Sequence, residues 1–133
     1  MKEFTDDQNC FVCGKKNQAG LQLEFKLNGR TGESEAPVTF LVRFQGWHET
    51  VHGGLLAAVL DETMIKAAGA AGHKCVTAEI TVKYRRPAPT GDGLSARGKI
   101  LEVRGRVVLA ESRICDAKGQ VIAQATGKLF KIT

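Results

Sequence analysis

The sequence predicts an α+β domain in which an antiparallel sheet of about six strands wraps around one long central helix. Two observations indicate this fold class. One segment of the 133-residue chain carries an apolar run of helical length, and six other segments alternate apolar and polar residues between turn signals. Because a single apolar helix must bury its surface against a sheet face, helix and strands are expected to pack on one another.

Two strands are expected ahead of the helix. The first is LQLEFKL at residues 21–27, which alternates and then breaks at the turn signal NGRTGE, and the second is VTFLVRF at residues 38–44. The period changes after His52. LLAAVLDETMIKAAGAAG at residues 55–72 is therefore the expected helix, and it ends among glycines.

Four further strands follow, with the turn signals PTGDG and DAKGQ among them. They are TAEITVKYRRP (77–87), SARGKILEVR (95–104), VVLAESRICD (107–116) and VIAQATGKLFKI (121–132). In the first of them, alternation places Ala78 and Ile80 on the core face, and Thr77 and Glu79 on the other face. No repeat or linker indicates a second module, so residues 1–133 are expected to form one domain.

Composition argues against several classes of partner. The net charge of +5 comes from Lys and Arg scattered along the chain, without the clustered basic face of a nucleic-acid-binding protein. No stretch approaches the roughly 20 apolar residues of a membrane span, and the polar start MKEFTDDQNC lacks the character of a signal peptide. We therefore expect a cytoplasmic protein with neither a nucleic-acid nor a membrane partner.

The four cysteines, Cys10, Cys13, Cys75 and Cys115, are too few and too unevenly spaced for a disulfide framework. Cys10 and Cys13 form a C-x-x-C, which is half of a zinc site, but no second C-x-x-C or H-x-x-x-H completes it. Packing of a loop is the favoured role of this motif. Neither a metal nor a cofactor is expected.

The expected helix carries an acidic residue on its apolar stripe. At about 100° per residue, Asp61 lies on the same face as Met64 and Ile65. Glu62 falls on another face, where Lys66 follows four residues later as the partner in an exposed ion pair. Burying an unpaired carboxylate is expensive, so Asp61 is expected either to pair with a Lys or Arg from a neighbouring strand or to be retained for chemistry.

Gly53 and Gly54 stand in the first turn of the same helix, directly after His52. Unpaired N–H groups point outward at such a terminus, and the helix dipole favours negative charge there. A carbonyl oxygen resting on these amides would be polarised, and stabilised further in a tetrahedral intermediate, so the combination with Asp61 suggests acyl transfer. An ordinary helix entry, with His52 packing or capping, explains the same residues.

Three stretches resemble a known family. FQGWHETVHGGLLAAVLDE resembles the signature of hotdog-fold acyl-CoA thioesterases of the phenylacetate-pathway (PaaI-like) branch, in which HGG is followed after six residues by an acidic residue of the central helix. CFVCGKKNQAGLQLEF and TAEITVKYRRPAPTGD resemble the opening of these proteins and the strand after their helix. The resemblance implies a hotdog fold and hydrolysis of an acyl-CoA thioester to free acid and coenzyme A.

The resemblance also implies roles for individual residues. Asp61 would be the catalytic carboxylate, as a nucleophile or as a general base that activates water, and the Gly53 amide would polarise the thioester carbonyl. Thr77 would help to hold the nucleophilic water, and His52 would orient the carbonyl-binding loop. Gln45 matches a polar side chain near the carbonyl, although some members place an Asn one residue later, where this chain has glycine.

Additional contacts to the substrate are expected from Gly54 and from basic residues that could bind the phosphates of coenzyme A. These candidates are Lys83, Arg85, Arg86, Arg104 and Arg106. The resemblance further implies a homodimer, often paired into a tetramer, with active sites composed from two subunits, and the need to cover sheet edges is an independent reason for such pairing.

Two alternative functions stay open. The first is a non-catalytic acyl-CoA-binding hotdog protein, and the second is a hotdog enoyl-CoA hydratase or dehydratase. A binding module would have no need for an acid on the apolar stripe of the helix. A dehydratase would be expected to arrange its histidine and acid differently from HGG-x6-D.

Overall fold

The computed structural model describes residues 4–132, and its elements follow in the predicted order of two strands, one long helix and four strands. A short 3-10 helix lies between the second strand and the long helix. The elements are β1 (Lys26–Asn28), β2 (Glu33–Val38), η1 (Val42–Phe44), α1 (Gly53–Ala70), β3 (Cys75–Tyr84), β4 (Leu94–Arg104), β5 (Val107–Cys115) and β6 (Val121–Lys131).

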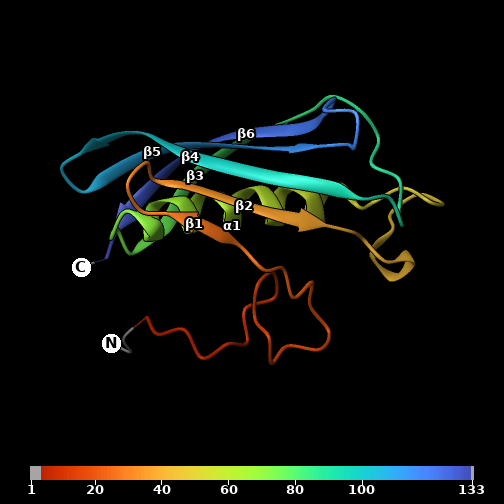
Figure 1. Cartoon of the computed structure of the whole chain (residues 1–133), viewed down its shortest axis with the longest axis horizontal. Helices are drawn as coiled ribbons and strands as arrows, with labels where there is room; N and C mark the ends of the chain where they lie inside the picture. The colour runs from red at the N-terminus through yellow and green to blue at the C-terminus, as the bar shows by residue number, and fades with distance from the viewer. Residues whose placement is uncertain (1–3, 133) are drawn as a thin grey trace.

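The six strands form one antiparallel sheet in the order β1-β2-β4-β5-β6-β3. Figure 1 shows this sheet curled over one side of α1, while the N-terminal segment crosses the opposite side of the helix. The predicted α+β class and hotdog fold are confirmed. β1 and β3 are the two edges of the sheet, so the long strand β3 leaves one side unpaired within the chain.

The prediction of the first two strands was wrong in its boundaries. Only Lys26 and Leu27 of the expected strand at 21–27 belong to β1, and the second strand lies at Glu33–Val38 rather than at 38–44. The inward positions of β2 include Ser34 and Ala36, which are too small and too polar to produce a strong apolar alternation. The alternation at 38–44 instead comes from a loop and η1, which insert Phe40 and Phe44 into the core and leave Leu41 and Val42 exposed.

The helix lies close to the sheet because small residues face it. Seven α1 residues at helical spacing are buried: Leu56, Val59, Leu60, Thr63, Met64, Ala67 and Ala68. A Cβ at Gly98 of β4 would lie 2.8 Å from the carbonyl oxygen of Thr63, so only glycine fits at this crossing. The buried hydroxyl groups of Ser34 and Ser112 donate hydrogen bonds to helix carbonyl oxygens at 2.6 and 2.8 Å.

Within the described part of the chain, no helix is both long and apolar enough to cross a lipid bilayer. The long helix α1 carries Asp61, Glu62 and Lys66 among its apolar residues. Its sequence therefore suits burial on one face against the sheet.

Candidate active site

Asp61 lies half-buried on α1 and faces β3. The hydroxyl group of Thr77 donates a hydrogen bond to its Oδ1 atom at 2.5 Å, a length typical of a hydroxyl bonded to a carboxylate. Among residues 4–132, no Lys, Arg or His lies within ion-pair distance of this carboxylate. The predicted alternative of a salt bridge to a neighbouring strand is therefore wrong, and Asp61 keeps its second oxygen available for chemistry.

A β-bulge in β3 turns Thr77 toward Asp61. The register between β3 and β6 shifts between Thr77 and Glu79. Thr77 pairs with Leu129 and Glu79 pairs with the adjacent Lys128, so β3 has one residue more than β6 at this point. The extra residue, Ala78, is exposed, whereas Thr77 now lies on the helix-facing side. The predicted placement of Thr77 on the same face as Glu79, and of Ala78 in the core, is therefore wrong, because simple alternation assumes an unbroken strand.

The first turn of α1 presents one free amide. The Nδ1 atom of His52 accepts a hydrogen bond from the N–H of Gly54 at 2.9 Å, so His52 caps the helix and the Gly54 amide is occupied. None of the hydrogen bonds among residues 4–132 uses the N–H of Gly53. Of the two glycines expected to contact a carbonyl, Gly53 has the available donor and Gly54 does not.

Tyr84 holds this turn from the end of β3. Its hydroxyl group donates to the carbonyl oxygen of Gly53 at 2.7 Å, and its ring lies 3.5 Å from the position that a Cβ of Gly53 would take. The same alternation that puts Ala78 and Ile80 on the core face predicts only that Tyr84 lies on that face too. A tyrosine at the end of a strand carries no sequence signal for a contact with a helix terminus 31 residues earlier.

Gln45 lies in the loop that precedes α1. Its Oε1 atom accepts a hydrogen bond from the N–H of Glu49 at 3.1 Å, and its backbone bridges to Val51. Gln45 is exposed, and its side-chain N–H₂ group makes no hydrogen bond to another residue among 4–132. Trp47, at the tip of the same loop, is 87% exposed, which is unusual for so large an apolar side chain.

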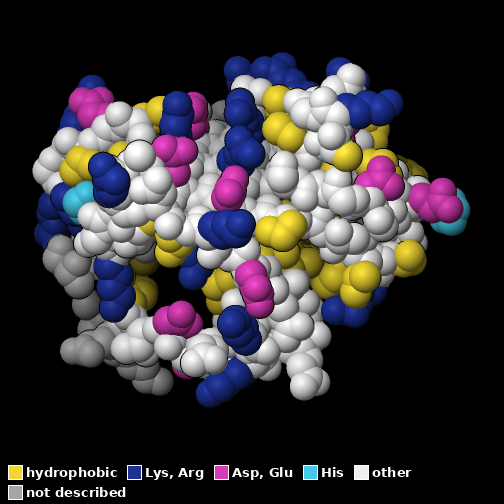
Figure 2. Space-filling view, viewed as in Figure 1, with side chains coloured by type: hydrophobic (Ala, Val, Ile, Leu, Met, Phe, Trp, Pro, Cys, Tyr) yellow, Lys and Arg dark blue, Asp and Glu magenta, His cyan; other side chains and the backbone are white. Residues whose placement is uncertain are grey.

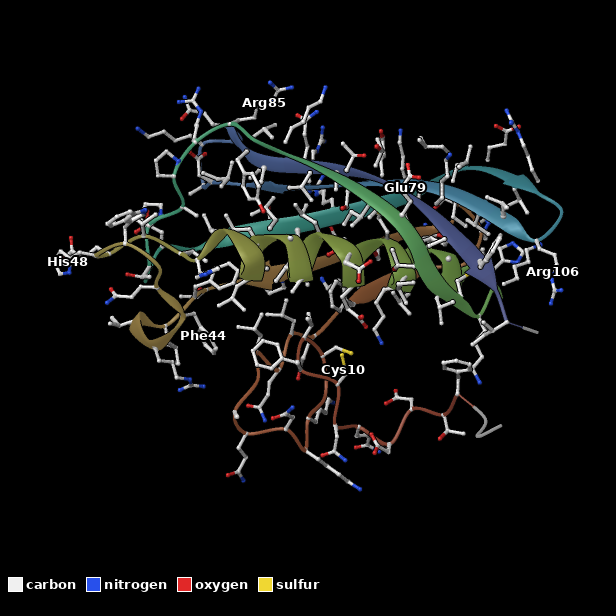
Figure 3. The ribbon with its side chains drawn as sticks, turned by 180° about the vertical axis from the view of Figure 1, so that it is seen from behind. Cys10, Phe44, His48, Glu79, Arg85 and Arg106 are labelled. Atoms are coloured by element: carbon white, nitrogen blue, oxygen red, sulfur yellow. The ribbon has the colours of Figure 1, made fainter. Side chains whose placement is uncertain are left out.

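The candidate basic residues separate into two groups. Lys83, Arg85 and Arg86 are exposed at the end of β3, and Figure 3 shows Arg85 at the same end of the molecule as the start of α1 and the loop with His48. Arg106 lies at the opposite end, beyond α1. The predicted grouping of Arg104 and Arg106 with the β3 residues is therefore wrong within one chain.

The predicted exposed ion pair between Glu62 and Lys66 is also wrong. The N-terminal segment covers this face of α1, so that both side chains are half-buried. Glu62 accepts a hydrogen bond from the thiol of Cys13 at 3.2 Å, and the ligand atoms of Cys10, Cys13 and Glu62 lie within 4.8 Å of one another. This is the one group of side chains among residues 4–132 that is arranged to hold a metal ion.

Three concave regions lie on the described part of the chain, and one of them, a cavity, is larger than the other two. The cavity, of about 890 Å³, lies between the N-terminal segment, α1 and β3, and Figure 2 shows a hollow between the N-terminal segment and the body of the molecule. The two smaller regions lie over β1, β2 and β4 to β6. Asp61 and Thr77 line none of these three, and both are half-buried between α1 and the edge strand β3.

The chain was compared with known proteins. A family model described as the thioesterase superfamily matches residues 48–123, which is more than half of the chain. No curated protein shows a significant match. A crystal structure described as a thioesterase superfamily protein is 30% identical with a TM-score of 0.86, covering 92% of this chain. The present chain spans 63% of the length of that protein.

Two more distant structures share the fold. The E. coli PaaI protein from the phenylacetic acid degradation operon is 21% identical with a TM-score of 0.78, over 85% of this chain and 81% of that one. A hypothetical thioesterase from Streptococcus pneumoniae, solved with coenzyme A, is 18% identical with a TM-score of 0.77, over 82% and 84%. Other structures of that protein carry alanine in place of one aspartate or one threonine. With its hotdog fold and with the family match across α1 and β3, this chain belongs to the thioesterase superfamily.

Proposed function

We propose that this protein is an acyl-CoA thioesterase in which Asp61 is the catalytic carboxylate. The observation that carries the proposal is the half-buried Asp61 carboxylate, which is held by Thr77 and has no cationic partner among the described residues. A carboxylate in such a position is oriented but not neutralised, which is what a nucleophile or general base requires. The Gly53 amide at the N-terminus of α1 supplies the second element of the site, a donor for a developing oxyanion.

Asp61 and the Gly53 N–H can hydrolyse a thioester by either of two routes. As general base, Asp61 takes a proton from water while the water oxygen bonds to the thioester carbonyl carbon; the C–S bond then breaks, and the proton passes to the departing thiolate. As nucleophile, Asp61 bonds to the same carbon, the C–S bond breaks and the thiolate of coenzyme A leaves; water later hydrolyses the anhydride, which frees the acid and regenerates the Asp61 carboxylate, and a proton from this water ends on the thiolate. In both cases the products are a carboxylic acid and coenzyme A, and the Gly53 N–H stabilises the negative charge on the carbonyl oxygen.

The two groups cannot serve one carbonyl within a single chain. Gly53 and Asp61 are eight positions apart on α1, which is about 12 Å along the helix axis. A thioester carbonyl touches its donor at about 3 Å and its attacking oxygen at about 3.5 Å, so the two groups must lie within about 8 Å of each other. The Asp61 side chain extends mainly sideways from the helix and does not close this gap.

A homodimer formed through the unpaired edge of β3 would bring Gly53 of one subunit near Asp61 of the other. If β3 pairs antiparallel with its copy, the two sheets become continuous and the two α1 helices lie side by side in opposite directions. The first turn of one helix then faces the middle of the other. Gly53 of one subunit and Asp61 of its partner would bracket one thioester, which gives two composite sites per dimer. Further pairing of dimers into a tetramer is compatible with this arrangement.

Coenzyme A is the proposed carrier of the acyl group. Lys83, Arg85 and Arg86 lie at the end of the molecule where α1 begins, so they can contact phosphates while the thioester reaches Gly53. Gln45 and the exposed Trp47 lie in the loop beside that turn. The coenzyme A found in the streptococcal structure supports this class of substrate.

The substituted residues of the streptococcal protein support the assignment of Asp61 and Thr77. The aspartate and the threonine that were replaced there are sixteen positions apart, and so are Asp61 and Thr77. The aspartate precedes the threonine in both chains. Two residues of the same types at the same separation in a protein of the same fold are consistent with a shared site.

The test is coenzyme A release from a panel of short-chain, medium-chain and aryl acyl-CoA esters, with hydration of an enoyl-CoA measured in parallel. We expect thiol release, and we expect Asp61→Asn to lower kcat by about 100-fold or more while acyl-CoA still binds. The matched control is Asp92→Asn, because Asp92 is exposed in the turn after β3. Binding of acyl-CoA without thiol release would favour the non-catalytic alternative, and hydration without thiol release would favour a hydratase.

Labelled water in a single turnover separates the two roles of Asp61. Transfer of ¹⁸O into the Asp61 carboxylate would show an anhydride intermediate. Label found only in the product acid would favour direct attack by water, because hydrolysis of an anhydride at the aspartyl carbonyl would put label in the enzyme. Equal loss of activity in Asp61→Asn and Asp92→Asn, or an Asp61→Asn protein that is merely unfolded, would return Asp61 to a structural role.

A further inference from the structure

Cys10, Cys13 and Glu62 form a cluster outside the proposed active site. The two sulfur atoms and one Glu62 oxygen lie within 4.8 Å of one another, and Cys13 Sγ lies 3.2 Å from Glu62 Oε1. In a tetrahedral zinc site, ligand atoms are about 3.5–3.8 Å apart, given Zn–S bonds of about 2.3 Å and Zn–O bonds of about 2.1 Å. We propose that these three residues bind one Zn²⁺ ion.

The turn that carries the cysteines is built to place both on one side. The N–H of Gly14 donates to the carbonyl oxygen of Cys10 at 2.8 Å, which closes the turn C-F-V-C-G. A Cβ at Gly14 would lie 2.4 Å from the backbone nitrogen of Cys10 and 2.5 Å from the carbonyl oxygen of Gln8. Only glycine fits there, and the turn directs both thiols toward α1.

The third ligand comes from the helix and not from the sequence neighbourhood of the cysteines. Glu62 is 49 positions after Cys13, so the spacing of cysteines and histidines along the sequence does not reveal it as a third ligand. The expectation that no metal binds rested on that spacing alone. The fold brings a carboxylate to the two thiols, and Figure 3 shows Cys10 on the side of the N-terminal segment that faces α1.

The charges of the cluster fit a divalent cation. Two thiolates and one carboxylate carry three negative charges; the half-buried Lys66, one turn along α1, balances one of them, and Zn²⁺ would balance the other two. In the metal-free protein, burial and then the charge of Glu62 raise the pKa of the Cys13 thiol to about 12. Burial alone would lower the pKa of Lys66, but Cys13 and Glu62 outweigh it and raise that pKa.

Solvent reaches the cluster through the cavity between the N-terminal segment and α1, which Cys10, Cys13, Glu62 and Lys66 line. A metal ion can therefore enter without unfolding the chain, and water can take the fourth tetrahedral position. The bound ion would fasten the N-terminal segment to α1 at the residue that directly follows Asp61. This inference concerns a different face of α1 and does not depend on the thioesterase reaction.

The test uses the full chain, freed of metal and titrated with Zn²⁺ in competition with a chromophoric chelator. We expect one equivalent to bind with a Kd below about 1 μM. Titration with Co²⁺ should produce thiolate-to-cobalt charge-transfer bands and the visible bands of a tetrahedral ion. Wild-type protein that binds less than one equivalent, or that binds Co²⁺ without thiolate bands, would overturn the proposal.

Variants identify the ligands. Cys10→Ser and Cys13→Ser should weaken Zn²⁺ binding by at least about 100-fold, and Glu62→Gln by at least about tenfold with the thiolate bands retained. Cys75→Ser is the matched control, because Cys75 lies outside the cluster, and it should bind as the wild type does. An equal loss in Cys75→Ser, or a Glu62→Gln protein with wild-type affinity, would contradict the three-ligand site. If a variant fails to fold, the wild-type titration still decides the question.

Discussion

Replacing Gly53 with proline removes the proposed oxyanion donor with little expected disturbance of the fold. Gly53 is the first residue of α1, where proline is favoured because its fixed φ suits the helix and its missing N–H has no helical acceptor. His52 has φ −59° and ψ 129°, a conformation that a residue before proline readily adopts. No described residue accepts a hydrogen bond from the Gly53 N–H, so the substitution mainly removes a donor to the substrate.

We expect Gly53→Pro to lower kcat by about 100- to 1000-fold, which corresponds to about 2.7–4 kcal/mol for the loss of one oxyanion donor. Gly53→Ala is the matched control because it keeps the N–H. Its Cβ would meet the Tyr84 ring at 3.5 Å, an ordinary contact, so its kcat should stay within a few-fold of wild type. Steady-state release of coenzyme A measures both variants, and thermal unfolding checks that their folds are equally stable.

Mixing two inactive variants tests the composite site. After subunit exchange between Gly53→Pro and Asp61→Asn proteins, half of the dimers are mixed and one of their two sites has both groups intact. About a quarter of wild-type activity should therefore return. Gly53→Pro activity equal to that of Gly53→Ala would refute the donor role. No recovery on mixing, with subunit exchange confirmed, would refute the two-subunit site.

Further predictions follow from single contacts. Thr77→Val should lower kcat by about 10- to 150-fold, since a hydrogen bond to a charged group is worth about 1.5–3 kcal/mol, whereas Thr77→Ser should stay near wild type; equal activities would contradict the positioning role. Tyr84→Phe should lower kcat/KM by about fivefold in the same assay, and no change would show that the contact with Gly53 is dispensable. Sedimentation at micromolar concentration should show a dimer or tetramer; a fully active monomer would exclude composite sites. In the metal-free protein, the folded state holds the Cys13 proton more tightly than the unfolded chain, because the pKa rises from 9.0 to about 12. This stabilisation is present below pH 9 and is lost as the pH rises toward 12. The free energy of unfolding, measured with urea, should therefore fall more steeply with pH above 9 in wild type than in Cys13→Ser.

Local patterns in the sequence determined the elements whose periodicity is strong. The predicted helix at 55–72 differs from α1 by two residues at each end, and the four strands after it were predicted within a few residues of their observed bounds. The sequence also distinguished Asp61 from its acidic neighbour, because an acid on an apolar stripe stands out in a helical pattern. The first two strands were misplaced because β2 is lined by small inward residues.

Only the tertiary structure decided which groups meet at the candidate site. The bulge that turns Thr77 toward Asp61 depends on pairing with β6, about 50 residues further along the chain. Gly53 rather than Gly54 has a free N–H because the His52 side chain accepts the hydrogen bond of Gly54. Glu62 is half-buried and bonded to Cys13 because the N-terminal segment folds over α1. Sequence periodicity reports how each segment partitions between core and solvent, whereas these contacts join segments that are distant in the chain and leave no periodic trace.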